Sequence, residues 1–248
     1  MSPNADRSLK KLLMNPLSLN LLAITVFVFT MSALLGPLIH LSPSVPAIAA
    51  AGLLGLVTVD TLGWQGRGLT IVLDAIAGTS AERRLRVTQH EAGHFLVAHV
   101  LDVPISGYTL TAWEAFKQGQ NGRGGVQFDD RQLLEQLQQG TISDRLLHRY
   151  ATIWMAGIAA ETLLYGTAEG GDDDRIQLRS ILSQLRPAVT DISARERWAL
   201  LQAKTLIETH QEAYQCLLKA MEQRLTVAEC TQTIAESIDA ELQESDGS

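Results

Sequence analysis

The chain has 248 residues, 46% of them hydrophobic, which is enough for one ordinary domain with an appendage. Its formal net charge is -7, and it contains no block rich in Lys or Arg. Because phosphate binding needs a concentrated basic surface, these properties argue against nucleic acid as a partner. Cys216 and Cys230 have no ligand-like spacing and are expected to be reduced thiols.

Two apolar runs near the N-terminus predict a transmembrane hairpin at residues 17–64, after an N-terminal segment of residues 1–16. Leu17 to Ile39 contains 23 residues without a formal charge. At about 1.5 Å of helical rise per residue, this run is long enough to cross a hydrocarbon core of about 30 Å. Pro46 to Trp64 is shorter and contains Asp60. A cleaved signal peptide is the alternative for the first run, because basic residues precede it.

The basic residues around this hairpin predict its orientation. They flank it on both outer sides, whereas His40 to Val45 has neither Lys nor Arg. By the positive-inside rule, both chain ends would lie on the cytoplasmic or an equivalent, stromal side. The expected location is therefore an integral two-pass protein of a plasma or thylakoid membrane. The flanking cations are Arg7, Lys10, Lys11, Arg67, Arg83, Arg84 and Arg86.

The elements after the hairpin predict one mainly α domain at residues 79–242, with a linker at 65–78 and a tail at 243–248. A surface helix or a strand is the alternative for the linker. Thr79-Ser80-Ala81-Glu82 has the pattern of a capping box and predicts a helix to about Leu101. A small β-sheet or hairpin follows, in which strands Ile105–Thr111 and Gly124–Phe128 flank a polar loop. Further helices are expected at Arg131–Gln139, Asp144–Tyr165, Asp172–Leu185, Ser193–Arg224 and Val227–Leu242.

The first predicted helix of this domain contains His90-Glu91-Ala92-Gly93-His94. Histidines four residues apart lie on one helix face, so both imidazoles can bind the same metal ion. The adjacent Glu91 is the residue type that accepts a proton from a metal-bound water in hydrolytic zinc sites. Two solvated helix histidines are the alternative reading. A catalytic zinc site needs a third protein ligand, and the acids at Asp172 to Asp174 are candidates.

Beyond this motif, the sequence resembles the peptidase domain of the FtsH-type membrane-anchored zinc proteases. Three segments carry the resemblance, which extends from about Ala81 to Glu236: ERRLRVTQHEAGHFLVAHVL, GRGGVQFDD and AGIAAETLLYG. The resemblance implies one Zn²⁺ per chain, a mostly helical FtsH-like fold and a peptidase activity. It implies that Glu91 is the catalytic base and Glu161 a partner of a zinc-bound histidine. The implied ligands are His90, His94 and Asp174, with Asp173 as the alternative to Asp174.

The sequence also departs from that family. Fewer than thirty residues separate Trp64 from His90, where the family places an ATPase module, and no phosphate-binding Gly-x-x-x-x-Gly-Lys-Ser/Thr loop occurs. We therefore expect no nucleotide partner. The expected function is a membrane-anchored zinc metalloendopeptidase that cleaves unfolded or flexible proteins without its own ATPase. An intramembrane protease is disfavoured, because the charged residues Glu82, Arg83, Arg84 and Arg86 lead directly into the motif.

The expected partners are protein or peptide substrates and the lipid bilayer. Gly125, Val126 and Phe128 are the predicted substrate-binding residues, on a strand edge along which an extended peptide can add. The alternative function is a catalytically weak or inactive subunit that acts as a partner or scaffold in membrane protease assemblies. Association with FtsH-type ATPase-proteases, or of the chain with itself, is left open.

Overall fold

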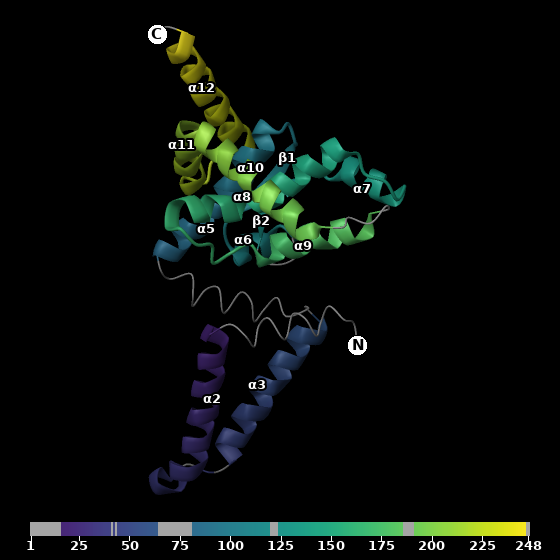
Figure 1. Cartoon of the computed structure of the whole chain (residues 1–248). Helices are drawn as coiled ribbons and strands as arrows, with labels where there is room; N and C mark the ends of the chain where they lie inside the picture. The colour runs from purple at the N-terminus through teal and green to yellow at the C-terminus, as the bar shows by residue number, and fades with distance from the viewer. Residues whose placement is uncertain are drawn as a thin grey trace. The chain divides into compact units, whose positions relative to one another are not determined.

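The computed structural model describes residues 16–40, 42, 44–63, 81–119, 124–185 and 191–246 (Figure 1). The chain divides into two compact units, Met1–Ala77 and Gly78–Ser248. The predicted linker at 65–78, the first two residues of the predicted capping box and nearly all of the predicted N-terminal segment lie outside the described residues.

The described residues of the first unit form two helices and a short turn. Helix α2 (Pro16–Leu35) is followed by the 3-10 turn η1 (Gly36–Ile39) and helix α3 (Ser44–Gly63). The run Leu17–Ile39, expected as one uninterrupted helix, is divided before Gly36-Pro37, because proline lacks the backbone N–H that continues a helix. Helix α3 carries the buried acidic residue Asp60.

The predicted membrane crossings are wrong. Among the helices of the described residues, none combines the length and the apolar character that a membrane span requires. The first apolar run extends to Ile39, but helix α2 ends at Leu35. The second run contains the acidic residue Asp60, which interrupts its apolar sequence. The transmembrane hairpin at residues 17–64, and the integral two-pass location derived from it, are corrected accordingly.

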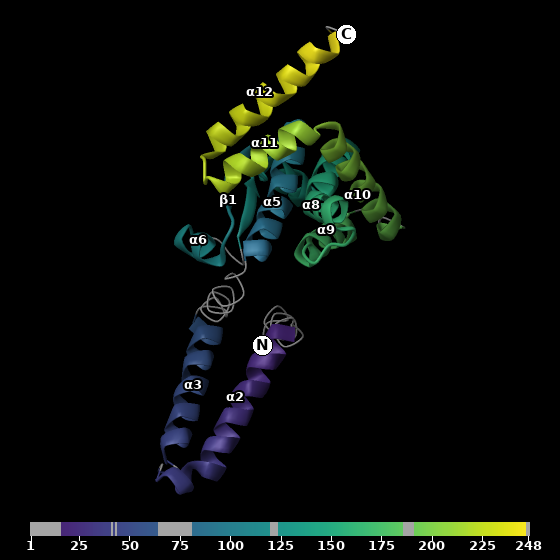
Figure 2. The same ribbon diagram turned by 90° about the vertical axis from the view of Figure 1, so that its left-hand side faces the viewer.

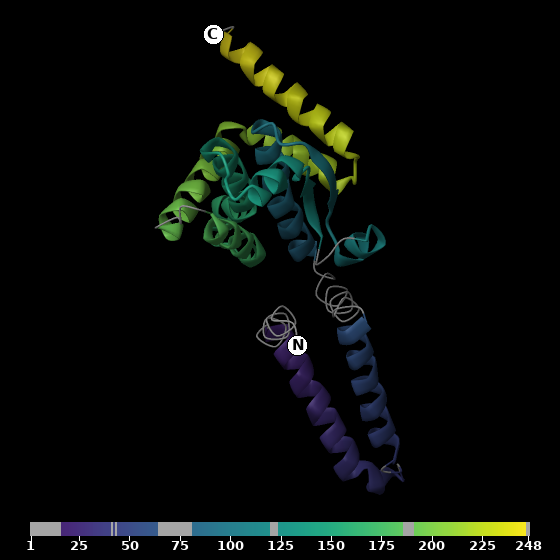
Figure 3. The same cartoon turned by 90° about the vertical axis from the view of Figure 1, so that its right-hand side faces the viewer.

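The second unit is mostly helical and contains one two-stranded sheet among its described residues. Strands β1 (Ile105–Thr109) and β2 (Gly125–Phe128) pair antiparallel, with Ile105 opposite Phe128 and Tyr108 opposite Val126. The strands lie between α5 and α6 (Figures 2 and 3). The helices are α5 (Ala81–Val100), α6 (Ala112–Lys117), α7 (Arg131–Gln138), α8 (Asp144–Tyr165), α9 (Asp172–Gln184), α10 (Ile192–Thr209), α11 (Gln211–Glu222) and α12 (Val227–Asp246).

Helix α8 forms the centre of this unit. It begins after Ser143, whose side chain accepts a hydrogen bond from the Leu146 amide, and ends at Gly166, whose φ of 76° suits glycine. Helices α5 and α10 pack on α8, and α11 packs on both α5 and α12. The middle of α8 is almost completely inaccessible, so both of its neighbours pack on an apolar surface.

Helix α6 occupies the segment predicted as a polar loop. Its N-cap Thr111 accepts a hydrogen bond from the Glu114 amide, and the Glu114 carboxylate accepts one from the Leu110 amide. Thr111-Ala112-Trp113-Glu114 therefore has the Thr-x-x-Glu spacing of a capping box, which the sequence already contained.

The predicted long helix Ser193–Arg224 is two helices. The chain bends at His210, which has φ of -112° and ψ of 44° and lies between α10 and α11. Neither Gly nor Pro marks this position. The bend allows α10 to pack on α8 while α11 packs on α5 and α12, so it follows from tertiary packing rather than from a local signal.

A glycine sets the distance between α5 and α8. A Cβ added at Gly93 would lie 2.6 Å from the Ala156 carbonyl oxygen and 2.8 Å from the Ala160 Cβ. Both distances are shorter than van der Waals contact, so the two helix backbones approach each other at this point as closely as only glycine permits.

We therefore expect Gly93→Ala to lower the free energy of unfolding by about 1–3 kcal/mol, despite the higher helix propensity of alanine. Urea unfolding of the chain in excess chelator, which removes any metal contribution, measures this change. Gly55→Ala in α3 is the control, because a Cβ there meets no atom within 4 Å. Equal stability of the Gly93→Ala variant and the unmodified chain would contradict the close approach.

Candidate metal centre

Helix α5 presents His90 and His94 on one face, next to α8. The two side chains are 11% and 6% exposed, and their rings pack edge to face with centroids 4.8 Å apart. Their Nε2 atoms are 3.1 Å apart. The two histidines of the motif, four residues apart on the helix, therefore bring their Nε2 atoms close together, as the sequence predicted.

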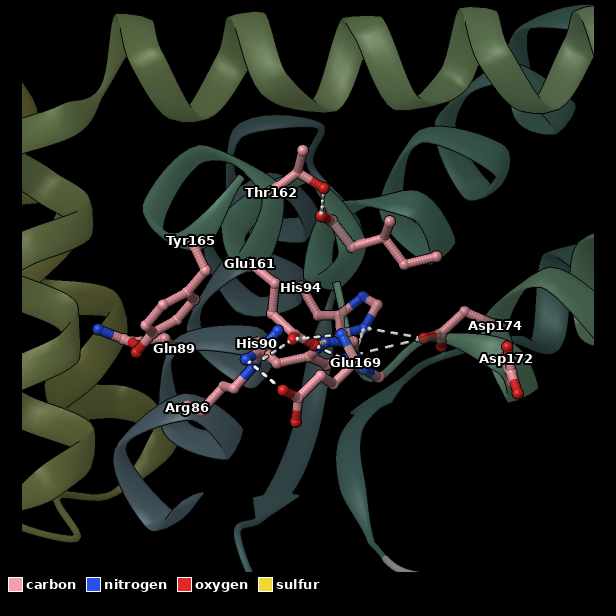
Figure 4. A network of polar contacts seen from close by, with 12 residues as sticks. Arg86, Gln89, His90, His94, Glu161, Thr162, Tyr165, Glu169, Asp172 and Asp174 are labelled. Carbon is pink, nitrogen blue, oxygen red and sulfur yellow. Dashed lines mark hydrogen bonds and ion pairs between the residues drawn. The ribbon is translucent and has the colours of Figure 1, made fainter. Parts of the chain in front are cut away.

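Asp174 completes this cluster from the first turn of α9. Its Oδ2 lies 3.3 Å from His90 Nε2 and 3.6 Å from His94 Nε2 (Figure 4). Asp172 and Asp173 are exposed, and Asp172 makes no contact with the histidines. Of the three consecutive acids considered from the sequence, Asp174 is the one brought to the histidines.

The hydrogen bonds of the opposite ring nitrogens orient both imidazoles. His90 Nδ1 lies 2.8 Å from Glu161 Oε1, and His94 Nδ1 lies 2.7 Å from the carbonyl oxygen of Ile153. A carboxylate and a carbonyl only accept, so each Nδ1 carries a hydrogen, and each Nε2 is the ring nitrogen that faces the other histidine and Asp174. Both partners belong to α8, and Glu161 thus takes the position beside a histidine that the resemblance implies.

This arrangement fits a metal ion. Two lone pairs 3.1 Å apart repel each other unless a proton or a cation binds them, and the Asp174 carboxylate adds a third donor. Within the described part of the chain, these three side chains form a group whose ligand atoms all lie within 4.8 Å of one another. Two histidines and one carboxylate are a donor set that zinc accepts, with a coordination position left for water or substrate.

The Asp174 and Glu161 carboxylates are anionic at neutral pH. Burial lowers the pKa of His90, but hydrogen bonds with Asp174 and Glu161 outweigh it and raise the pKa to about 10. Burial raises the pKa of Asp174, but the two histidines hold it well below its usual range. Burial also raises the pKa of Glu161, but the hydrogen bond from His90 and its other donors lower it to about 2. The resulting negative charge can offset a bound cation.

Glu91 lies beside His90 and His94 and contacts strand β2. Its Oε2 accepts a hydrogen bond of 3.0 Å from the Val126 amide, and a Cβ added at Gly125 would lie 3.2 Å from the same oxygen. The structure thus brings two of the three predicted substrate-binding residues to Glu91. Phe128 is at the other end of the strand, where it pairs with Ile105 and packs against the core.

Three residues that surround the site were not predicted from the sequence as site residues. A Cβ at Gly157 would lie 2.3 Å from His90 Nε2, and one at Gly170 would lie 2.7 Å from Glu161 Oε1. Arg86 donates to Glu161 from one helical turn before His90. Two features of the sequence could have indicated them. Arg86 precedes His90 by four residues and so shares its helix face, and Gly157 is a glycine inside an apolar helix.

Two of the remaining histidines, His148 and His210, lie outside the cluster and have other partners. His148 Nε2 lies 2.6 Å from an Arg195 nitrogen, and its ring packs on Trp198. His210 lies at the bend between α10 and α11, with its Nδ1 3.8 Å from Glu241 Oε2. These surroundings agree with the absence of any ligand spacing around them in the sequence.

Comparison of the chain with protein-family models and with curated proteins finds no significant match. The likeness to FtsH-type peptidases therefore remains a resemblance carried by the three segments quoted above, and the site is interpreted from its own geometry.

Asp174→Asn tests the third ligand. Because the amide carries no charge, we expect this variant to bind zinc at least about tenfold more weakly than the unmodified chain, which should bind about one zinc ion. Elemental analysis after equilibrium dialysis measures both quantities.

Asp172→Asn is the matched control, since it removes the same charge two residues away without touching the histidines. A larger loss of zinc in Asp172→Asn, or in Asp173→Asn, would show that the wrong carboxylate has been assigned.

Proposed function

We propose that the chain is a zinc-dependent metallopeptidase that hydrolyses peptide bonds of unfolded or flexible proteins. The observation that carries the proposal is the convergence of His90 Nε2, His94 Nε2 and Asp174 Oδ2 beside the Glu91 carboxylate. The proposed ligands belong to two helices, and the hydrogen bonds at the Nδ1 atoms leave each Nε2 as the nitrogen that would bind the metal in place of a proton.

Zinc bound at such a site supplies a water of lowered pKa and a Lewis acid for a peptide carbonyl. Glu91 is the proposed general base, because its carboxylate lies near both histidines and is not one of the three ligand side chains. The hydrogen bond from the Val126 amide holds the carboxylate in position while leaving its second oxygen free to accept a proton.

The edge of β2 supports an extended peptide as the substrate. The Val126 amide donates to Glu91, so this part of the strand faces the proposed base. A peptide that adds alongside β2 would pass Glu91 in an extended conformation, which an unfolded segment adopts readily. Gly125, with φ of 131° and no side chain, leaves space beside the carboxylate.

Glu91→Gln tests the activity directly. We expect the variant to retain zinc, because the ligands are unchanged, and to cleave an unstructured fluorogenic polypeptide at least about 100-fold more slowly in the absence of ATP. Glu82→Gln, an exposed glutamate on the same helix, is the control and should keep full activity.

Undiminished cleavage by Glu91→Gln would exclude Glu91 as the base. Zinc binding by the unmodified chain without cleavage of any unstructured polypeptide would exclude the peptidase and support the partner or scaffold role.

A further inference from the structure

Arg86 connects three segments of the second unit through one guanidinium group. Its Nε donates to Glu161 Oε2 on α8 at 2.6 Å, and one terminal nitrogen donates to the Thr167 carbonyl oxygen at 2.9 Å. The other terminal nitrogen lies 2.9 Å from Glu169 Oε1. The guanidinium also lies over the Tyr165 ring, 4.6 Å from its centroid (Figure 4).

The Glu161 carboxylate, which is 3% exposed, accepts hydrogen bonds at both oxygens. Oε1 accepts from His90 Nδ1 at 2.8 Å and from the Gly170 amide at 3.1 Å. Oε2 accepts from Arg86 at 2.6 Å and from the Glu169 amide at 2.9 Å. With four donors, this carboxylate cannot rotate without losing several hydrogen bonds, and it therefore holds the His90 ring in one orientation.

The same contacts hold the segment that leads into α9. Arg86 binds the carbonyl of Thr167, and Glu161 binds the amides of Glu169 and Gly170. Gly171, the N-cap of α9, follows directly, and Asp174 lies in the first turn of that helix. The position of the Asp174 carboxylate thus depends on a segment that Arg86 and Glu161 attach to α5 and α8.

We infer that Arg86 is a positioning residue of the proposed metal centre, which orients His90 through Glu161 and Asp174 through the segment 167–170 before the metal binds. The inference rests on the proposed function. A lysine can neutralise Glu161 but cannot serve the three acceptors of Arg86, because an ammonium group lacks the planar, forked donors of a guanidinium. Arg86→Lys therefore keeps the positive charge but removes the forked donor geometry, whereas Arg86→Gln removes the charge.

The test compares the full chain with Arg86→Gln and Arg86→Lys, and uses Arg83→Gln, an exposed arginine on the same helix, as the control. Competition with a chromophoric chelator measures the Kd for zinc. The visible absorption of the Co²⁺-loaded chain reports the ligand geometry. Thermal unfolding in chelator reports the stability of each metal-free variant.

We expect both Arg86 variants to bind zinc about 10–100-fold more weakly than the unmodified chain, and their Co²⁺ bands to shift or weaken. Arg83→Gln should change neither. A merely structural role would lower the unfolding temperature and leave the Co²⁺ spectrum unchanged.

An unaltered Kd and spectrum in Arg86→Lys would overturn the inference while leaving the metal centre intact. This variant also decides the question if Arg86→Gln does not fold. Failure of the unmodified chain to bind zinc would overturn the proposed function itself.

Discussion

The close contact between α5 and α8 is the constraint on which the rest of the second unit depends. Gly93 allows the backbones to approach, and Gly157 leaves space for the His90 ring. Because of this distance, Ile153 and Glu161 on α8 reach the Nδ1 atoms of the two histidines on α5. Helix α5 carries the two histidines, and the hydrogen bonds of their Nδ1 atoms to α8 fix the orientation of the rings.

The polar groups of the site depend on one another because they are buried. A buried carboxylate is costly unless it is paired and hydrogen-bonded, and Glu161 has a cation, a histidine and two backbone amides as partners. The four donors come from α5 and from the segment before α9. The carboxylate thus joins the elements that carry His90 and Asp174, and the burial that makes it costly also gives these hydrogen bonds their strength.

Local signals predicted most of the elements correctly where hydrophobic period and capping residues agreed. Helix α8 has the predicted bounds because a Ser N-cap and a left-handed glycine mark its ends. The hairpin forms from the two predicted strands. The capping residues Thr111 and Glu114 are a local signal for α6, whereas the bend at His210 has no local signal and depends on the packing of α10 and α11 on different neighbours. The membrane prediction, which rested on counting uncharged residues in the sequence, is wrong: among the described helices none is long and apolar enough to span a membrane.

For the site, the sequence by itself determined that His90 and His94 share a helix face with Glu91 adjacent, since a helix places residues four apart one turn from each other. It offered Asp172 to Asp174 as candidates for a third donor. Only the tertiary structure decided that Asp174 lies next to the histidines and that the Val126 amide contacts Glu91. It also decided that Arg86 donates a hydrogen bond to Glu161. The residues that meet in these contacts are 35 to 84 positions apart in the sequence. Whether they meet depends on how the helices pack, which no local sequence pattern encodes.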